Sequence, residues 1–122
     1  MTFRRSSLTL VALIATMIPA QADNAGSYLA ARSAMISSDY DEASQYYARA
    51  LQRDPLNPQL LENATNAFVG LGNVERAAVF AERLLATGEA SQIAGLTLIG
   101  EYARNGEWDA ALDGVNLSLI HI

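Results

Sequence analysis

The chain has 122 residues, with 13 acidic residues against eight arginines and no cysteine. This length allows one small domain. Because the chain contains no cysteine, a disulfide framework, a thiolate metal site and a thiol nucleophile are excluded. The net charge of −5, without a basic cluster, argues against nucleic acids and anionic membrane surfaces as partners.

Positions 1–22 have the order of a secretory signal peptide. Arg4 and Arg5 lie in a start without acids, an apolar run covers 8–18, and Ala-Gln-Ala at 20–22 is a small-x-small cleavage site. We therefore expect export, with cleavage after Ala22. The alternative is a membrane anchor, but the apolar run is well short of the roughly 20 residues that a span requires. The mature chain is then expected to have no membrane span.

After this leader, one pattern recurs at a fixed interval. The pattern is a small residue, a polar residue and a large apolar residue in succession, with an alanine three positions after the large apolar one. The three copies are Ser38-Asp39-Tyr40 with Ala43, Gly72-Asn73-Val74 with Ala77, and Gly106-Glu107-Trp108 with Ala111. A fixed period of this length indicates a stacked repeat architecture, and an ordinary helical bundle has no reason to keep it.

Each unit is predicted to contain two helices joined by a tight turn. The first helices are expected over 25–36, 58–69 and 92–103, and the second helices from about Tyr40, Val74 and Trp108. The turns lie at Ser38, Gly72 and Gly106, where helix ends favour a left-handed residue.

Local signals support these helix ends. Asp39 and Glu42 have the spacing of a capping box, and Asp54 before Pro55 ends the first unit. Asn57 is predicted to cap the next helix, which has proline in its first turn.

The alanine of each copy should let its two helices approach closely. The large apolar residue of each copy is expected to cover the turn. The residues expected to meet neighbouring helices are Tyr47, Leu51, Leu84 and Leu85.

The pattern resembles the tetratricopeptide repeat, whose consensus is two antiparallel helices in about 34 residues. The first unit matches the family at 39–43, Tyr47, Ala50-Leu51 and Asp54-Pro55. The second unit matches it at 72–77, with Ala64 and Phe68 at the small and aromatic positions of its first helix. The third unit matches it at Leu98, Tyr102, Gly106, Trp108 and Ala111. The first unit departs from the family at Ser27, Ala30 and Ala31, where Trp, Leu and Gly are preferred. The resemblance implies an all-α solenoid, an α–α superhelix of about three repeats, at 23–57, 58–91 and, in part, 92–116.

Apolar and polar residues alternate at helical spacing up to Asn116, but segment 117–122 does not continue this pattern. It is similar to the translated read-through of a sequencing adapter. We therefore expect a non-native tail on the front part of a longer protein. The alternative is the start of a closing helix face, because Leu119 lies in repeat register with Leu51 and Leu85.

The resemblance also implies a protein or peptide partner, bound on the concave face that the first helices form. The positions that would face this groove are Tyr28, Arg32, Met35, Ile36, Gln59, Glu62, Asn66, Val69, Ile93, Leu96, Ala103 and Arg104. Their mixed character suits an amphipathic or extended segment. A carboxylate clamp of the family's kind is disfavoured, because only Asn66 and Arg32 offer suitable donors.

Catalytic hypotheses find little support. The acids Asp39, Asp41 and Glu42 suit a helix start without any catalytic need, and His121, the only histidine, lies in the doubtful tail. We expect no enzyme activity, metal or cofactor. The sequence favours an exported adaptor in the periplasm or envelope of a Gram-negative bacterium. The alternative is the docking arm of a larger envelope-assembly machine or enzyme.

Overall fold

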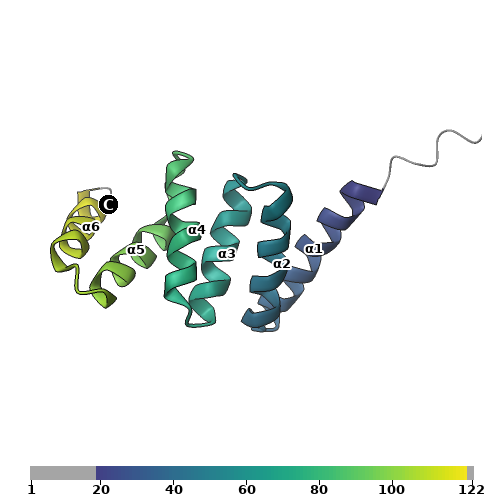
Figure 1. Cartoon of the computed structure of the whole chain (residues 1–122), viewed down its shortest axis with the longest axis horizontal. Coiled ribbons are helices and arrows are strands. Elements are labelled where there is room, and N and C mark those ends of the chain that lie inside the picture. Colours follow the sequence, from purple (N-terminus) through teal and green to yellow (C-terminus); the bar gives the residue numbers. More distant parts are fainter. Residues whose placement is uncertain (1–18, 121–122) are drawn as a thin grey trace, which may run out of the picture.

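The computed structural model describes residues 19–120 and the side chains of 25–117. Most of the predicted signal peptide and residues 121–122 lie outside this part. The described part is all-α, and its helices follow one another along the long axis of the molecule (Figure 1). They are α1 (Pro19–Ile36), α2 (Tyr40–Arg53), α3 (Pro58–Gly70), α4 (Val74–Ala86), α5 (Gln92–Arg104) and α6 (Trp108–Ile120).

The predicted helix starts agree with the structure at Tyr40, Pro58, Val74, Gln92 and Trp108. The first helix differs, because α1 begins at Pro19 and not at residue 25. Proline is tolerated in the first turn of a helix, and no proline or glycine follows until Gly26, so nothing stops the helix from starting early. The last helix continues through Ile120, beyond the expected break after Asn116.

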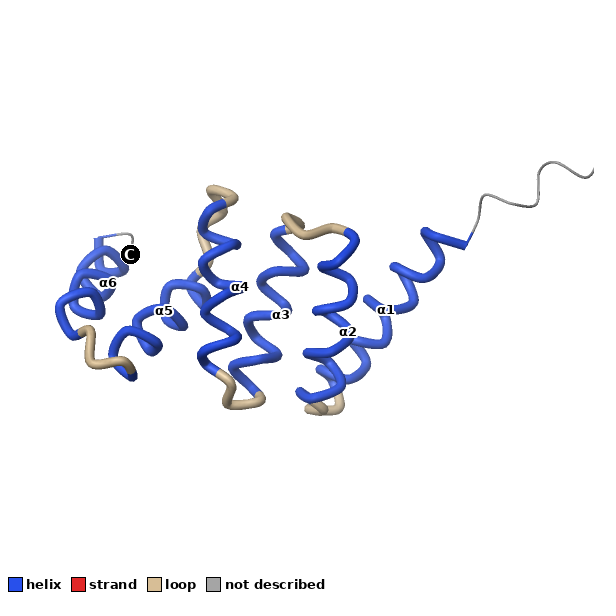
Figure 2. The backbone as a smooth tube through the Cα atoms, in the orientation of Figure 1, coloured by secondary structure: helices blue, strands red, loops and turns tan. Residues whose placement is uncertain are grey.

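Each helix packs against the next one along the chain, and α3 also packs against α5. The connections alternate between the two edges of the array (Figure 2). This consecutive packing agrees with a helical repeat solenoid. No helix in the described part is both long and apolar enough to cross a bilayer.

The three short turns share one hydrogen-bonding scheme. Ser38, Gly72 and Gly106 have φ values of 57°, 80° and 78°, which confirms the predicted left-handed residue. In the first turn the Asp39 N–H donates to the Ala34 carbonyl at 2.8 Å, and equivalent bonds close the other two turns. This is the Schellman arrangement, which satisfies carbonyls that a helix end leaves free.

Side chains cap the helices that follow these turns and loops. Asp39, Asn57, Asn73 and Ser91 each accept a hydrogen bond from the backbone N–H three residues later. The predicted capping box is formed only on its Asp39 side, since the Asp39 N–H already donates to the turn. The bond from the turn thus satisfies the amide that Glu42 was expected to reach.

The repeated alanines lie in the core. Ala43 and Ala77 are fully buried and Ala111 nearly so, as expected where two helices approach closely. Tyr47, Leu51 and Leu84 are buried as predicted, with at most 3% of each residue exposed.

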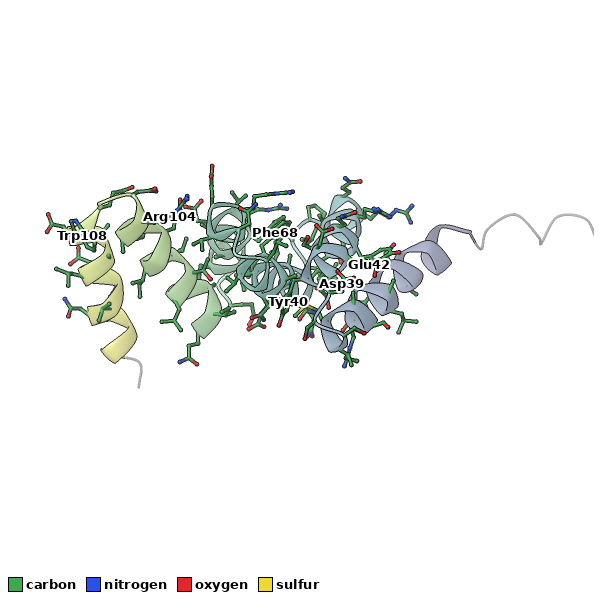
Figure 3. All side chains as sticks on the ribbon, turned by 90° about the horizontal axis from the view of Figure 1, so that it is seen from below. Asp39, Tyr40, Glu42, Phe68, Arg104 and Trp108 are labelled. Atoms are coloured by element: carbon green, nitrogen blue, oxygen red, sulfur yellow. The ribbon has the colours of Figure 1, made fainter. Side chains whose placement is uncertain are left out.

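Leu85, which was expected to meet a neighbouring helix, and Trp108, which was expected to cover its turn, are both exposed. Trp108 is 64% exposed and Leu85 is 38% exposed. Trp108 lies at the α6 end of the array, whereas Tyr40, its equivalent in the first unit, lies toward the middle (Figure 3). Tyr40 is covered by Gly70 of the following helix, and among the described helices α6 packs principally on α5. Tertiary neighbours therefore decide the burial of this position.

Candidate partner-binding surface

The predicted groove residues lie on three helices that alternate along the array. Tyr28, Arg32, Met35 and Ile36 are on α1, Gln59, Glu62, Asn66 and Val69 on α3, and Ile93, Leu96, Ala103 and Arg104 on α5. All of them are half-buried or exposed, and Ile36 and Leu96 are the most exposed apolar members at 82% and 53%. Apolar side chains of this size in contact with solvent are available to a partner.

A hollow of about 350 Å³ brings together five of these residues from α1 and α3. Its lining is Tyr28, Arg32, Met35, Ile36, Tyr47, Gln59 and Asn63. We call it the α1–α3 hollow. Small residues on α1, including the buried Ala31 and Ala34, let that helix pack tightly on α2. The space between α1 and α3 is left partly open.

Two tyrosines form the apolar side of this hollow. The rings of Tyr28 and Tyr47 meet edge to face, with centroids 6.4 Å apart. Burial raises the pKa of the Tyr47 hydroxyl, Tyr28 adds to this rise, and the nearby Arg32 opposes it. The folded chain therefore holds this phenol proton more tightly than an exposed tyrosine would.

A second hollow, of about 330 Å³, continues the surface along α3. We call it the α3–α4 hollow, and its lining includes Gln59, Glu62, Leu84, Glu89 and Ser91. Glu62 accepts a hydrogen bond from the Ser91 hydroxyl at 3.3 Å, which fixes the carboxylate next to the start of α5. Gln59 lines both hollows and so connects them.

The groove residues of α5 and the end of α3 are arranged differently. Asn66, Val69, Ile93 and Leu96 lie outside these two hollows. Arg104 forms two hydrogen bonds of 3.0 Å with Glu101 and lies 3.7 Å from Glu75 of α4. The Arg104 hydrogen bonds lower the pKa of the Glu101 carboxyl. The guanidinium of Arg104 is thus engaged within the chain.

Tyr47 and Asn63 line the α1–α3 hollow but were not predicted as groove residues. Asn63 lies one helical turn after Gln59, and this spacing is a signal that could have identified it. Tyr47 was assigned to the core, where most of its surface does lie. The hollow as a whole offers two aromatic rings together with amide and guanidinium donors, which suits a peptide with both apolar and polar side chains.

Metal-ligating side chains would form another kind of site. In the part of the chain that the structure describes, no group of three His, Cys, Asp or Glu side chains lies close enough to hold a metal ion.

Comparisons with known proteins agree with the helical arrangement. A family model described as the tetratricopeptide repeat matches residues 34–99, from the end of α1 into α5. A search of curated proteins found no match. The matched segment covers more than half of the sequence and includes the tight turns before α2 and α4. The chain belongs to the tetratricopeptide repeat family.

Proposed function

We propose that the chain is a protein-interaction scaffold that binds a peptide or a partner helix along α1, α3 and α5. Tetratricopeptide repeats generally mediate protein–protein interaction, so the family supports this class of function. The observation that carries the proposal is the α1–α3 hollow, because five predicted groove residues from two repeat units meet there. We propose that the chain acts by binding and not by catalysis.

The partner segment is best matched by alternating apolar and polar side chains. Tyr28, Met35 and Ile36 offer apolar contacts, and Arg32 offers a charged donor at the same hollow. A segment that reaches the α3–α4 hollow meets Gln59 and then the carboxylate of Glu62. Burial of aromatic and apolar anchors would supply affinity, and the polar contacts would set the register.

The proposed location is the periplasm or cell envelope, which rests on the order of charged, apolar and small residues at positions 1–22. A second candidate is a docking arm within a larger envelope-assembly machine or enzyme. The same binding surface would serve either role.

The proposal is tested by selecting peptides from a random phage-displayed library against the purified chain. Gln59→Trp is the diagnostic variant, because Gln59 is exposed and lines both hollows. Gln52→Trp, at an exposed position of α2, is the matched control. Selected peptides should bind the parent chain and the control equally and lose roughly tenfold or more in affinity with Gln59→Trp. Equal binding to all three proteins would remove this surface as the binding site.

A further inference from the structure

The hollows of the proposed binding surface separate opposite charges. Among the described residues, Arg32 is the one charged residue that lines the α1–α3 hollow. The α3–α4 hollow is lined instead by the carboxylates of Glu62 and Glu89. Gln59 lines both hollows and joins them, so one continuous surface has a cationic side on α1 and an anionic side next to the start of α5.

The adjoining hollows keep this separation. A hollow of about 330 Å³ also contains Gln59, and the charged residue in its described lining is Asp54. A larger opening of about 850 Å³ between α4, α5 and α6 shares part of its lining with the α3–α4 hollow, and the charged residue there is Asp113. In the described lining of these four hollows, Arg32 is the only cation.

The charges of Arg32 and Glu62 are not neutralised within the described part of the chain. Neither residue forms a salt bridge there, whereas Arg104, the third charged residue of the predicted groove, is paired with Glu101. The Glu62 carboxylate accepts a hydrogen bond from the neutral Ser91 hydroxyl, which orients the carboxylate and leaves its charge in place. Two opposite charges on α1 and α3 are thus available to a partner.

The surroundings of Arg32 favour a charge pair. Its neighbours in the hollow include Tyr28, Met35 and Ile36, whose apolar surfaces would exclude water when a peptide lies over them. Excluding water lowers the local dielectric constant and strengthens the attraction between opposite charges. A carboxylate that pairs with Arg32 would therefore be best placed beside an apolar side chain of the same peptide.

We propose that the partner segment is dipolar: an acidic residue with an apolar neighbour pairs with Arg32, and a basic residue pairs with Glu62. This inference rests on the proposed function and adds the charge order of the peptide, which fixes the direction in which the peptide lies. A peptide with the two charges exchanged would place like charges together and would be rejected.

The selection of phage-displayed peptides tests this charge order. Peptides that lose binding with Gln59→Trp should carry one acid and one base in a constant order and at a constant spacing. The same selection against Arg32→Glu should return a base in place of that acid. Selection against Glu62→Lys should return an acid in place of that base. Urea melts establish that each variant is folded.

Anisotropy titrations of one selected peptide measure each pairing. Replacing the peptide's acid by its neutral amide should weaken binding to the parent chain roughly threefold to tenfold and should have no further effect with Arg32→Gln. Replacing the peptide's base by Gln should behave in the same way with Glu62→Gln, which keeps an acceptor for Ser91. The matched controls are Arg49→Gln and Glu82→Gln, at exposed positions of α2 and α4 outside these hollows, and they should bind every peptide as the parent chain does.

The outcomes separate this inference from the proposed function. Peptides that depend on Gln59 but show no fixed charge order, or additive effects in both cycles, would overturn the dipolar partner and leave the binding surface in place. Equal losses with the control variants would show attraction by net charge and not by contact, and would also overturn it. Self-association of the chain that Arg32→Gln abolishes would identify a second copy as the occupant. Selection of no peptide sensitive to Gln59→Trp would remove the proposed function and this inference together.

Discussion

The ring of Tyr40 lies against Gly70 so closely that a Cβ at position 70 would come within 2.5 Å of a ring carbon. Tyr40 begins α2 and Gly70 ends α3, so this contact joins two successive repeat units. Gly100 of α5 has no comparable neighbour, because a Cβ there would meet nothing within 4 Å.

We predict opposite effects of the same substitution at these two glycines. Gly70→Ala should lower the free energy of unfolding by about 1–3 kcal/mol, because the added methyl displaces the Tyr40 ring. Gly100→Ala should raise it by about 0.5–1 kcal/mol, because alanine loses less conformational entropy in a helix. Urea melts of both variants measure these changes, and equal shifts would contradict the tight contact.

Overpacking of the repeated alanine should also destabilise the chain. Ala77 is fully buried, so Ala77→Leu should cost roughly 1–3 kcal/mol of unfolding free energy. Glu82→Ala, at an exposed position of the same helix, should change it by no more than about 0.5 kcal/mol. Similar urea midpoints for the two variants would show that Ala77 does not lie at a close helix crossing.

Stability should fall at alkaline pH partly through Tyr47. Its pKa is raised in the folded chain, so the folded state holds this proton more tightly than the unfolded state does. The resulting stabilisation is complete below the unfolded pKa of about 10 and is lost as the pH rises through the folded value. Tyr47→Phe should therefore lose less stability between about pH 9 and pH 11. Parallel curves for the two proteins would rule out this contribution.

Expression in a Gram-negative host tests the proposed export. The chain should lose positions 1–22 and be recovered in the periplasmic fraction, because this segment has the order of a signal peptide. Intact-mass measurement of the fractionated protein checks both points. Full-length protein in the cytoplasm would contradict the interpretation of the leader.

The starts of α2 to α6 were predictable because local chemistry marks them, whereas the start of α1 and the end of α6 were not. Left-handed turn residues, capping side chains and Pro58 mark the starts of these five helices, whatever lies around them. Leu85 was expected to meet a neighbouring helix but is 38% exposed, because its burial depends on which helix covers it. The repeat period identifies which residues of two units are equivalent. Equivalent residues can still have different neighbours in the fold and so differ in burial.

The candidate surface was predictable to a similar degree. The register identified the faces of α1 and α3, and five of its residues meet at the α1–α3 hollow. The i, i+3 spacing of Glu101 and Arg104 favours their ion pair, which was not predicted, whereas the approach of Glu75 depends on how α4 packs on α5. The sequence did not indicate the opening between α4 and α6, because that opening arises from the positions of three helices together with Gly114.

The exposed position of Trp108 gives the chain a natural optical reporter. It is the only tryptophan in the sequence, and it begins α6, whereas Tyr28 and Tyr47 lie at the α1–α3 hollow. Indole emission therefore follows events at the α6 end, at a single known position. Local changes there can be observed in an unlabelled sample, because no other indole contributes.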